Sequence, residues 1–184
     1  MTEASIRTAW QGRFIEVVTR GGWEFVRRRS VGVVGIVALT DRGALVLIEQ
    51  VRPPLNCPVI ELPAGLVGDA ADNHDESPLV AAQRELIEET GFEAARIEPL
   101  ANGASSAGLT DELIELVLAR GLKKVAAGGG VDDEQISVHE VPLREVPDWL
   151  ASQQRQGKQV DLKVYAALWF AEQATAQRTL RTPQ

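Results

Sequence analysis

Short apolar runs dominate the first third of the chain, and their spacing predicts β-strands. The earliest runs alternate apolar with polar residues or carry β-branched side chains, and the next two are almost continuously apolar. The predicted strands cover residues 14–19, 23–28, 31–39, 44–51 and 59–62. Gly21-Gly22 predicts a hairpin turn between the first pair of strands, and Asp41-Arg42-Gly43 predicts a turn between the second pair.

The rest of the chain predicts one central helix, three more strands and two C-terminal helices. Ser77-Pro78 starts the central helix, because Ser is a good N-cap and Pro suits the first helical position. Gly91 ends it. The later strands are expected at 96–100, 112–119 and 136–141, and the later helices at 146–154 and 162–175. This order indicates an α/β fold in which a mixed sheet has helices on its faces.

Three carboxylates gather on one face of the central helix. At about 100° per residue, Glu85, Glu88 and Glu89 fall within roughly a 100° arc. Local helix physics opposes this arrangement, because Glu85 and Glu89 are an i,i+4 like-charge pair and the last turn is the negative end of the helix dipole. Such a cluster supplies hard oxygen ligands for Mg²⁺ or Mn²⁺. From the acids alone, a solvated acidic face explains the pattern equally well.

The residues around the cluster favour the metal interpretation. Leu79, Val80, Ala82, Leu86 and Ile87 fill the neighbouring sector of the helix. One flank of the helix is therefore expected to be buried, which puts the carboxylates at the edge of a core. Arg84 stands four residues before Glu88 and is expected to hold that side chain in position.

Residues 76–92 resemble the Nudix box, whose pattern is G-x5-E-x7-R-E-U-x-E-E-x-G-U with U apolar. The matching positions are Glu76, Arg84, Glu85, Leu86, Glu88, Glu89, Gly91 and Phe92. One position departs, because the family Gly would be residue 70 and this chain has Ala70. Gly65 is the natural partner, which indicates an insert of about five residues in a lengthened loop at 66–75. That loop either reshapes the sugar side of a pocket or is tolerated surface variation.

Two further segments are similar to ADP-ribose and nucleoside-diphosphate-sugar pyrophosphatases of this family. Gln50-Val51-Arg52 followed by Glu61-Leu62-Pro63-Ala64-Gly65 is similar to their Q-Y-R … E-L-P-A-G spacing. Ser105 to Glu112 resembles S-P-G-x-S-x-E, and Asp161-Leu162-Lys163 resembles D-x-K in the final helix.

Two positions bear on the substrate. Ala107 replaces the Pro of this subgroup, which leaves ADP-ribose, GDP-mannose and UDP-sugars open as substrates. Leu109 stands where diadenosine-polyphosphate hydrolases of the superfamily carry Tyr, which disfavours that substrate class.

The resemblance implies an α/β/α sandwich with an N-terminal strand extension, in a single domain over residues 1–184. Residues 31–184 would form the Nudix core, and strands within 1–30 would take part in a homodimer. The implied activity is a Mg²⁺-dependent pyrophosphohydrolase, with Mn²⁺ as an alternative ion, that releases a nucleoside monophosphate and a sugar phosphate. Two other readings are a Nudix-fold module that binds nucleotide sugars without cleaving them, and a scaffold subunit.

The resemblance also implies roles for individual residues. Glu85, Glu89 and the backbone carbonyl of Ala64 would bind metal, while Glu88 is either a third ligand or the partner of Arg84. The remaining assignments give Glu134, with Asp132 second, as metal ligand or general base, Arg84 as part of the catalytic set, and Arg52, Glu61 and Gly65 as substrate-binding residues. The alternatives are a solvated acidic loop for Glu134 and an ordinary surface position for Arg52.

Composition limits the other classes of function. The 184 residues carry a net charge of −7, which argues against a nucleic-acid partner bound through a broad basic surface. No apolar stretch approaches 18 residues and no signal-peptide pattern begins the chain, so we expect a cytoplasmic protein without membrane contact. Cys57 is the single cysteine, which fits a reducing compartment.

Aromatic, histidine and clustered arginine residues are less informative. Trp10, Phe14 and Trp23 are expected in the core or a dimer interface rather than under a nucleobase. Residues 27–29 are three consecutive arginines that could meet phosphate or a partner. His139 has no spacing partner for zinc and receives no role.

Overall fold

The computed structural model describes residues 5–29, 32–68, 75–131 and 134–181, with side chains as far as residue 176. The elements in chain order are β1 (Arg7–Gln11), β2 (Ile15–Arg20), β3 (Trp23–Arg28), β4 (Gly32–Leu39), β5 (Ala44–Arg52), β6 (Cys57–Glu61), β7 (Ala64–Val67), α1 (Pro78–Thr90), β8 (Phe92–Ala104), β9 (Leu113–Lys124), β10 (Ser137–Pro142), the 3-10 turn η1 (Leu143–Glu145), α2 (Val146–Arg155), β11 (Gln159–Val160) and α3 (Leu162–Arg181).

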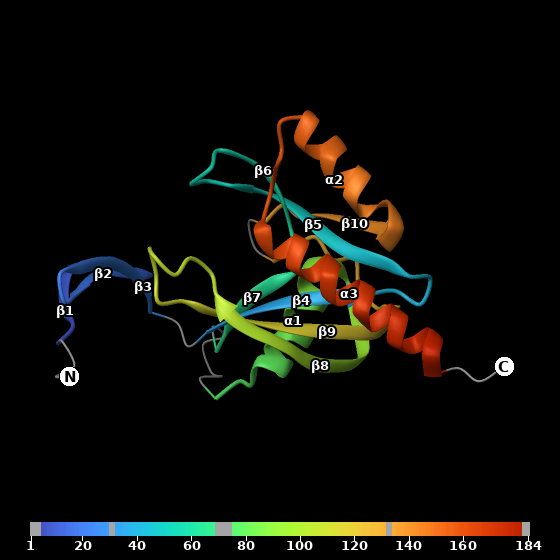
Figure 1. Ribbon diagram of the computed structural model, residues 1–184, viewed down its shortest axis with the longest axis horizontal. Helices are drawn as coiled ribbons and strands as arrows, with labels where there is room; N and C mark the ends of the chain where they lie inside the picture. The colour runs from blue at the N-terminus through green and yellow to red at the C-terminus, as the bar shows by residue number, and fades with distance from the viewer. Residues whose placement is uncertain (1–4, 30–31, 69–74, 132–133, 182–184) are drawn as a thin grey trace.

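The body of the molecule is a mixed sheet between two helical layers (Figure 1). Its strand order is β11-β6-β5-β4-β9-β8, with β10 paired to β5 and β7 paired to β4. The β4–β9 and β6–β11 pairs are parallel, and the other pairs are antiparallel. The predicted mixed sheet is therefore confirmed.

Each face of the sheet buries its own apolar core. Along β4, Val37 and Leu39 join a cluster that includes residues of α2 and α3, whereas Ile36 and Ala38 join a cluster that includes residues of α1. This alternation follows from the two-residue period of a strand. The α/β/α sandwich predicted from the sequence is confirmed, with α1 on one face and α2 and α3 on the other (Figure 1).

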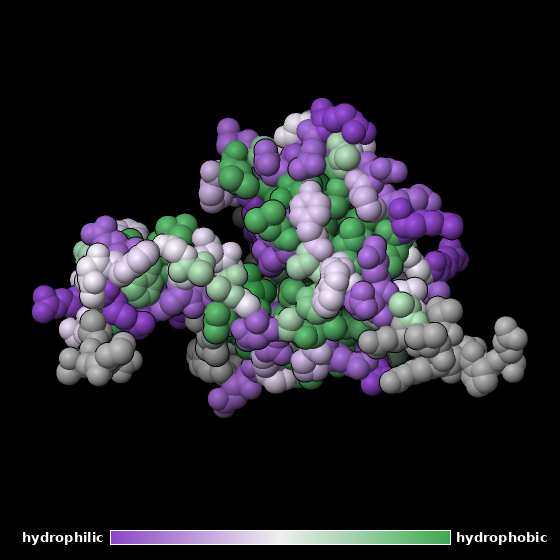
Figure 2. Space-filling view, in the orientation of Figure 1, coloured by the Kyte–Doolittle hydropathy of each residue, from purple (hydrophilic) through white to green (hydrophobic). Residues whose placement is uncertain are grey.

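β1, β2 and β3 form a separate antiparallel sheet that stands away from the body (Figures 1 and 2). Gly21 and Gly22 adopt φ of 57° and 89°, which confirms the predicted hairpin turn. Trp10, Phe14 and Trp23 are 56%, 66% and 69% exposed. The expectation that these aromatics belong to the core is therefore wrong for this chain, and the expectation of an interface stays a prediction.

The strand predictions differ from the structure where pairing rather than local pattern decides. β7 occupies residues predicted as loop, because its backbone pairs with β4 from Gly32↔Val67 to Gly35↔Ala64. The lengthened loop predicted at 66–75 thus begins after Val67, and residues 69–74 lie outside the described ranges. β1 and the two-residue β11 were not predicted. Within the part of the chain described, no helix is long and apolar enough to cross a membrane.

Candidate active site

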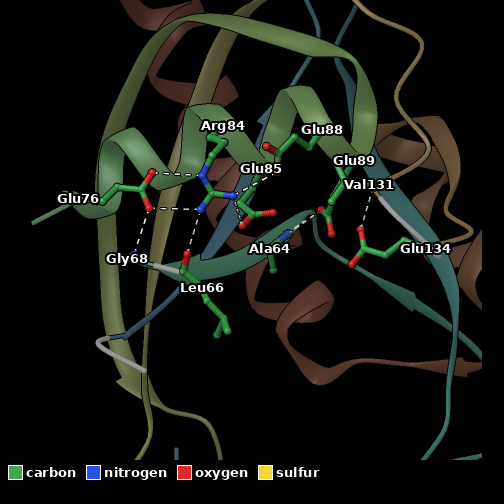
Figure 3. Close-up of polar contacts among 10 residues, drawn as sticks. All are labelled: Ala64, Leu66, Gly68, Glu76, Arg84, Glu85, Glu88, Glu89, Val131 and Glu134. Carbon is green, nitrogen blue, oxygen red and sulfur yellow. Dashed lines mark hydrogen bonds and ion pairs between the residues drawn. The ribbon is translucent and has the colours of Figure 1, made fainter. Parts of the chain in front are cut away.

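Helix α1 begins and ends where the sequence predicts. The Ser77 side chain accepts a hydrogen bond from the Val80 N–H, and Gly91 adopts φ of 70° while its N–H bonds the Ile87 carbonyl. The helix buries Ala81, Ala82 and Leu86 on its core face. Its acidic residues therefore lie on the flank that faces β7 and the loop after β9 (Figure 3).

Arg84 is the centre of a network that ties α1 to the end of β7 (Figure 3). Its guanidinium lies 3.2 Å from both carboxylate oxygens of Glu76, 2.7 Å from Glu85 Oε1 and 3.1 Å from Glu88 Oε2, and it donates to the Leu66 carbonyl at 3.1 Å. The predicted contact between Arg84 and Glu88 is confirmed. Arg84 thus positions the carboxylates of the helix rather than facing the cavity described below.

Glu76 anchors this network from the loop before the helix. Its side chain is 1% exposed, and it also accepts the Gly68 N–H at 3.0 Å. Hydrogen bonding to Arg84, opposed by burial and helped by the Gly68 amide, holds the pKa of Glu76 below its ordinary value. A charged Glu76 and Arg84 therefore form a partly buried pair whose remaining polar atoms are mostly satisfied.

Removing Arg84 should be strongly destabilising. We expect Arg84→Ala to lower the free energy of unfolding by about 2–4 kcal/mol, because it leaves Glu76 buried without its counter-ion. Urea denaturation in the presence of a chelator measures this change. Arg96→Ala is the matched control, since the Arg96–Glu98 pair has side chains 71% and 37% exposed and should contribute less than about 1 kcal/mol. Equal losses in the two variants would contradict the structural role of Arg84.

Glu89 is a buried carboxyl that faces other carboxylates. It is 5% exposed, and its Oε2 accepts the Ala64 N–H at 2.9 Å. Burial raises the pKa of Glu89 to about 8, and the charges of Glu85 and Glu134 contribute in the same direction. Burial also raises the pKa of Glu85, against the opposing effect of Arg84. The structure holds these acids in positions that are unfavourable without a compensating positive charge.

Gly65 allows β7 and α1 to approach closely enough to form this site. A Cβ atom at Gly65 would lie 1.9 Å from the carboxyl carbon of Glu85. No side chain fits at that separation unless Glu85 moves, so only glycine permits the observed placement of the carboxylate.

The glycine run after β9 brings Glu134 to the same site. Gly129 and Gly130, with φ of 107° and 89°, donate their N–H groups to the carbonyls of Glu89 at 2.8 Å and Glu88 at 3.1 Å. These bonds satisfy carbonyls at the end of α1 that lack helical partners. Glu134 then lies beside Glu89, with its Oε2 accepting the Val131 N–H at 3.1 Å (Figure 3). Asp132, the second candidate base, lies outside the described residues.

The carboxylates open onto a cavity of about 370 Å³ that has charges of both signs on its walls. Glu85, Glu89 and Glu134 contribute acids, and Arg28, Arg52 and Lys163 contribute cations. A carboxylate supports each cation in the pairs Arg52–Glu61 at 2.8 Å, Arg28–Glu112 at 2.6 Å and Lys163–Asp161 at 2.5 Å. The Arg and Lys side chains suit an anionic ligand, and the acids suit metal cations bound beside it.

Most of the predicted site residues converge on this cavity. Arg52, Glu61, Ala64, Gly65, Glu85, Glu89 and Glu134 line it. Glu88 and Arg84 are absent from its lining, and Glu88 contacts Arg84 instead. Sequence reasoning gave Lys163 no role, although it belongs to the quoted D-x-K segment, and it left Arg28 undecided within the arginine run.

The donor set fits a divalent cation in chemical type. Among the residues that the structure describes, no three Asp, Glu, His or Cys side chains already stand as a metal-binding group. Arg84 engages Glu85, and the Ala64 amide engages Glu89. Carboxylate and carbonyl oxygens are nevertheless the ligands that Mg²⁺ and Mn²⁺ prefer. The raised pKa values of Glu85 and Glu89 indicate acids whose repulsion a cation would relieve.

The fold and this cavity define a protein with a carboxylate-bearing helix set against a strand and loop of an α/β/α sandwich. This arrangement agrees with the comparison with protein families, in which the NUDIX domain matches residues 27–168. The chain belongs to the NUDIX domain family, and the predicted family is confirmed.

Several curated proteins are similar to this chain. The methanol dehydrogenase activator of Bacillus methanolicus is 38% identical over 123 residues, covering 66% of this chain and 64% of that protein. The ADP-ribose pyrophosphatase of Bacillus subtilis strain 168 is 34% identical over 115 residues, covering 62% and 60%. The GDP-mannose pyrophosphatase of Escherichia coli strain K12 is 32% identical over 163 residues, covering 80% and 82%.

The matched regions span less than two thirds of the first two of these relatives.

Among solved structures, the crystal structure of an ADP compounds hydrolase superposes with a TM-score of 0.73 at 23% identity, covering 98% of this chain and 96% of that one. This likeness confirms the fold. The relatives named as pyrophosphatases accord with the expectation of an enzyme of the Nudix hydrolase type.

Proposed function

We propose that this protein is a pyrophosphohydrolase that uses Mg²⁺, with Mn²⁺ as an alternative, to cleave ADP-ribose or a related nucleoside diphosphate sugar. Water would add to one phosphorus, the anhydride P–O bond would break, and a nucleoside monophosphate and a sugar phosphate would leave. The observation that carries this proposal is the cavity itself: Glu85, Glu89 and Glu134 lie on its walls beside three cations, each of which a further carboxylate supports. The relatives named ADP-ribose and GDP-mannose pyrophosphatase support it.

The acidic residues would hold the cation in this proposal. Glu85, Glu89 and the Ala64 carbonyl are the candidate ligands, because they line one cavity and offer hard oxygen atoms. Glu134 lines the same cavity and is either a further ligand or the general base. A bound divalent cation would neutralise diphosphate oxygens and assist ionisation of the attacking water. Arg84 would position Glu85 through their 2.7 Å contact.

The identity of the general base follows from which acids are already engaged. Glu89 accepts a hydrogen bond from the Ala64 N–H, and Glu85 accepts one from Arg84. Glu134 is exposed, and among the described residues its one hydrogen-bond donor is the Val131 N–H. Glu134 is therefore our first candidate for proton transfer from water, with Asp132 second. Glu88 is assigned to Arg84, and its service as a third ligand is the alternative.

The cationic residues would bind the diphosphate. Arg52 has a planar guanidinium that can donate two hydrogen bonds to phosphate oxygens, and Glu61 holds it at 2.8 Å. Lys163 and Arg28 line the same cavity and add positive charge. Gly65 would contribute by keeping the floor of the cavity open to Glu85.

The test is product analysis on a panel of ADP-ribose, GDP-mannose and UDP-glucose with Mg²⁺, beside diadenosine tetraphosphate. We expect one nucleotide sugar to be cleaved to a monophosphate and a sugar phosphate, and the diadenosine compound to be cleaved at least about 10-fold more slowly. Binding of nucleotide sugars without turnover would favour the non-catalytic module. If the protein neither bound nucleotide sugars nor gained stability from metal, that result would favour a scaffold subunit.

The remaining proposals concern organisation. We infer a single domain with residues 31–184 as core and residues 1–30 as an association segment for a homodimer. Support comes from the exposed aromatics of the detached sheet, Trp10, Phe14 and Trp23. The net charge of −7 supports the absence of a nucleic-acid partner. Free Cys57 agrees with a cytoplasmic setting.

A further inference from the structure

A second hollow, of about 1060 Å³, adjoins the cavity. Gln50 and Glu134 line both spaces, so they form the boundary between them. Beyond that boundary the walls include the polar side chains of Gln135 and Ser137. They also include an apolar surface from Val51, Pro53, Pro58 and Ile136. A ligand whose diphosphate occupied the cavity could therefore extend past Gln50 into this hollow.

The sheet leaves this hollow open because one strand pairing stops early. β10 pairs with β5 only as far as Ser137↔Glu49. β5 continues to Arg52, where its pairing is with β6 on the opposite edge. No strand in the described ranges pairs with the other edge of residues 50 and 51, and both residues line the hollow.

The polar side chains around the hollow are not committed elsewhere. Gln50 is half-buried, and neither it nor Gln135 nor Ser137 makes a side-chain hydrogen bond within the part of the molecule described. A half-buried carboxamide without a protein partner is a group that water or a ligand must satisfy. Glu49 differs, because Lys158 at 2.8 Å and His139 at 3.0 Å already occupy its Oε2.

The other end of the cavity has a different character. A hollow of about 590 Å³ shares Ile114 and Lys163 with the cavity, and its walls carry Leu116, Leu162 and Phe170. Such an apolar and aromatic surface suits a flat base. The hollow beside Gln50 is the more polar of the two and carries hydrogen-bonding side chains, so it suits the part of the substrate that is rich in hydroxyl groups.

We propose that the hollow beside Gln50 is the subsite for the sugar of the substrate, with Gln50, Gln135 and Ser137 as the hydroxyl-binding side chains. This inference rests on the proposed function and adds the direction in which the substrate lies. It also predicts that selectivity among sugars resides in these three residues, which donate and accept hydrogen bonds.

Filling the hollow tests this assignment. Ser137 is exposed at the start of β10, so Ser137→Trp should fold, and Glu140→Trp on the same strand outside the hollow is its matched control. The substrates are the cleaved nucleotide sugar and the methyl ester of the same nucleoside diphosphate. We expect the ratio of their kcat/KM values to fall at least about 10-fold in Ser137→Trp and to stay within about twofold in the control. An unchanged ratio in Ser137→Trp would overturn the assignment.

A binding measurement separates this inference from the hydrolase proposal. Saturation-transfer NMR with ribose 5-phosphate and glucose 1-phosphate reports sugar contact without turnover. We expect signals on sugar protons with the unaltered protein and with Glu140→Trp, and their loss with Ser137→Trp and Gln135→Trp. If this pattern of signals were seen in a protein that cleaves none of the substrates, the hydrolase proposal would be wrong and the sugar-subsite proposal would stand. Sugar signals that persist in both filled variants would contradict the sugar-subsite proposal even if the enzyme is active. Their absence from the unaltered protein would contradict it as well.

Discussion

Replacing Glu89 by Gln is expected to stabilise the metal-free protein at neutral pH while lowering turnover at least about 10²-fold. Glu89 is buried beside the negative charges of Glu85 and Glu134, which raises its pKa to about 8. A Gln at this position still accepts the Ala64 N–H but carries no charge. At neutral pH the folded parent must hold a proton on Glu89 that the unfolded chain releases. The substitution removes this unfavourable requirement and, at the same time, a candidate metal ligand.

The direction of the pH dependence follows from where each state holds its proton. An unfolded Glu89 loses its proton near pH 4.5, whereas the folded protein retains it to about pH 8. Between these values the folded state binds more protons, so its stability falls as the pH rises. Glu89→Gln lacks this contribution. The difference in unfolding free energy between variant and parent should therefore grow across this range to about 2–4 kcal/mol.

Thermal and urea unfolding at pH 5, 6, 7 and 8 with a chelator measure this difference. Saturating Mg²⁺ should then stabilise the parent more than Glu89→Gln, because the parent binds the ion more tightly. Glu93→Gln, at an exposed position just after the helix, controls for the loss of one negative charge. Glu88→Gln decides between the two readings of Glu88, since a ligand would lose metal-dependent stabilisation and an Arg84 partner would not. A Glu89→Gln protein that keeps full turnover would remove Glu89 from the mechanism.

The features that sequence alone predicted are those that depend on neighbouring residues. Ser77 and Gly91 bound α1 because N-capping and the left-handed C-terminal turn act within four residues. The face that carries Glu85 and Glu89 likewise follows from helical periodicity. These local rules are enough to place the acids at the edge of a core without any tertiary contact.

Other parts of the site depend on pairings between distant segments. The bonds from Arg84 to the Leu66 carbonyl and from Gly68 to Glu76 require β7, which exists through its pairing with β4. Lys163 reaches the cavity from the start of α3 and Arg28 from the end of β3. The D-x-K segment and the arginine run contain these residues, but neither local pattern places them at the cavity. β11 is only two residues long, so alternation of polar and apolar positions could not indicate it.

Substituting Gly65 by Ala should reduce turnover at least about 10²-fold with a smaller effect on folding. The added Cβ would lie 1.9 Å from the carboxyl carbon of Glu85 and 2.0 Å from its Oε1. Because the clash is with the end of a flexible side chain, Glu85 can move aside, and we expect a loss of about 1–3 kcal/mol of stability. The moved carboxylate would lose its 2.7 Å contact with Arg84 and its place among the acids. Misplacement of a reacting or ligating group by about 1 Å is enough for a 10²-fold loss.

Gly32→Ala is the matched control, since a Cβ at Gly32 would lie 3.8 Å from Val67 Cγ2, an ordinary van der Waals distance. Steady-state kinetics on the cleaved nucleotide sugar, with urea unfolding of both variants, measure the two effects separately. A Gly65→Ala protein with Mg²⁺ stabilisation and turnover like those of Gly32→Ala would show that Glu85 need not occupy its observed position. If Gly65→Ala alone lost Mg²⁺ stabilisation and turnover, metal binding would depend on the close approach of β7 and α1. The acids themselves are the same in the two variants, so their chemistry could not explain the difference.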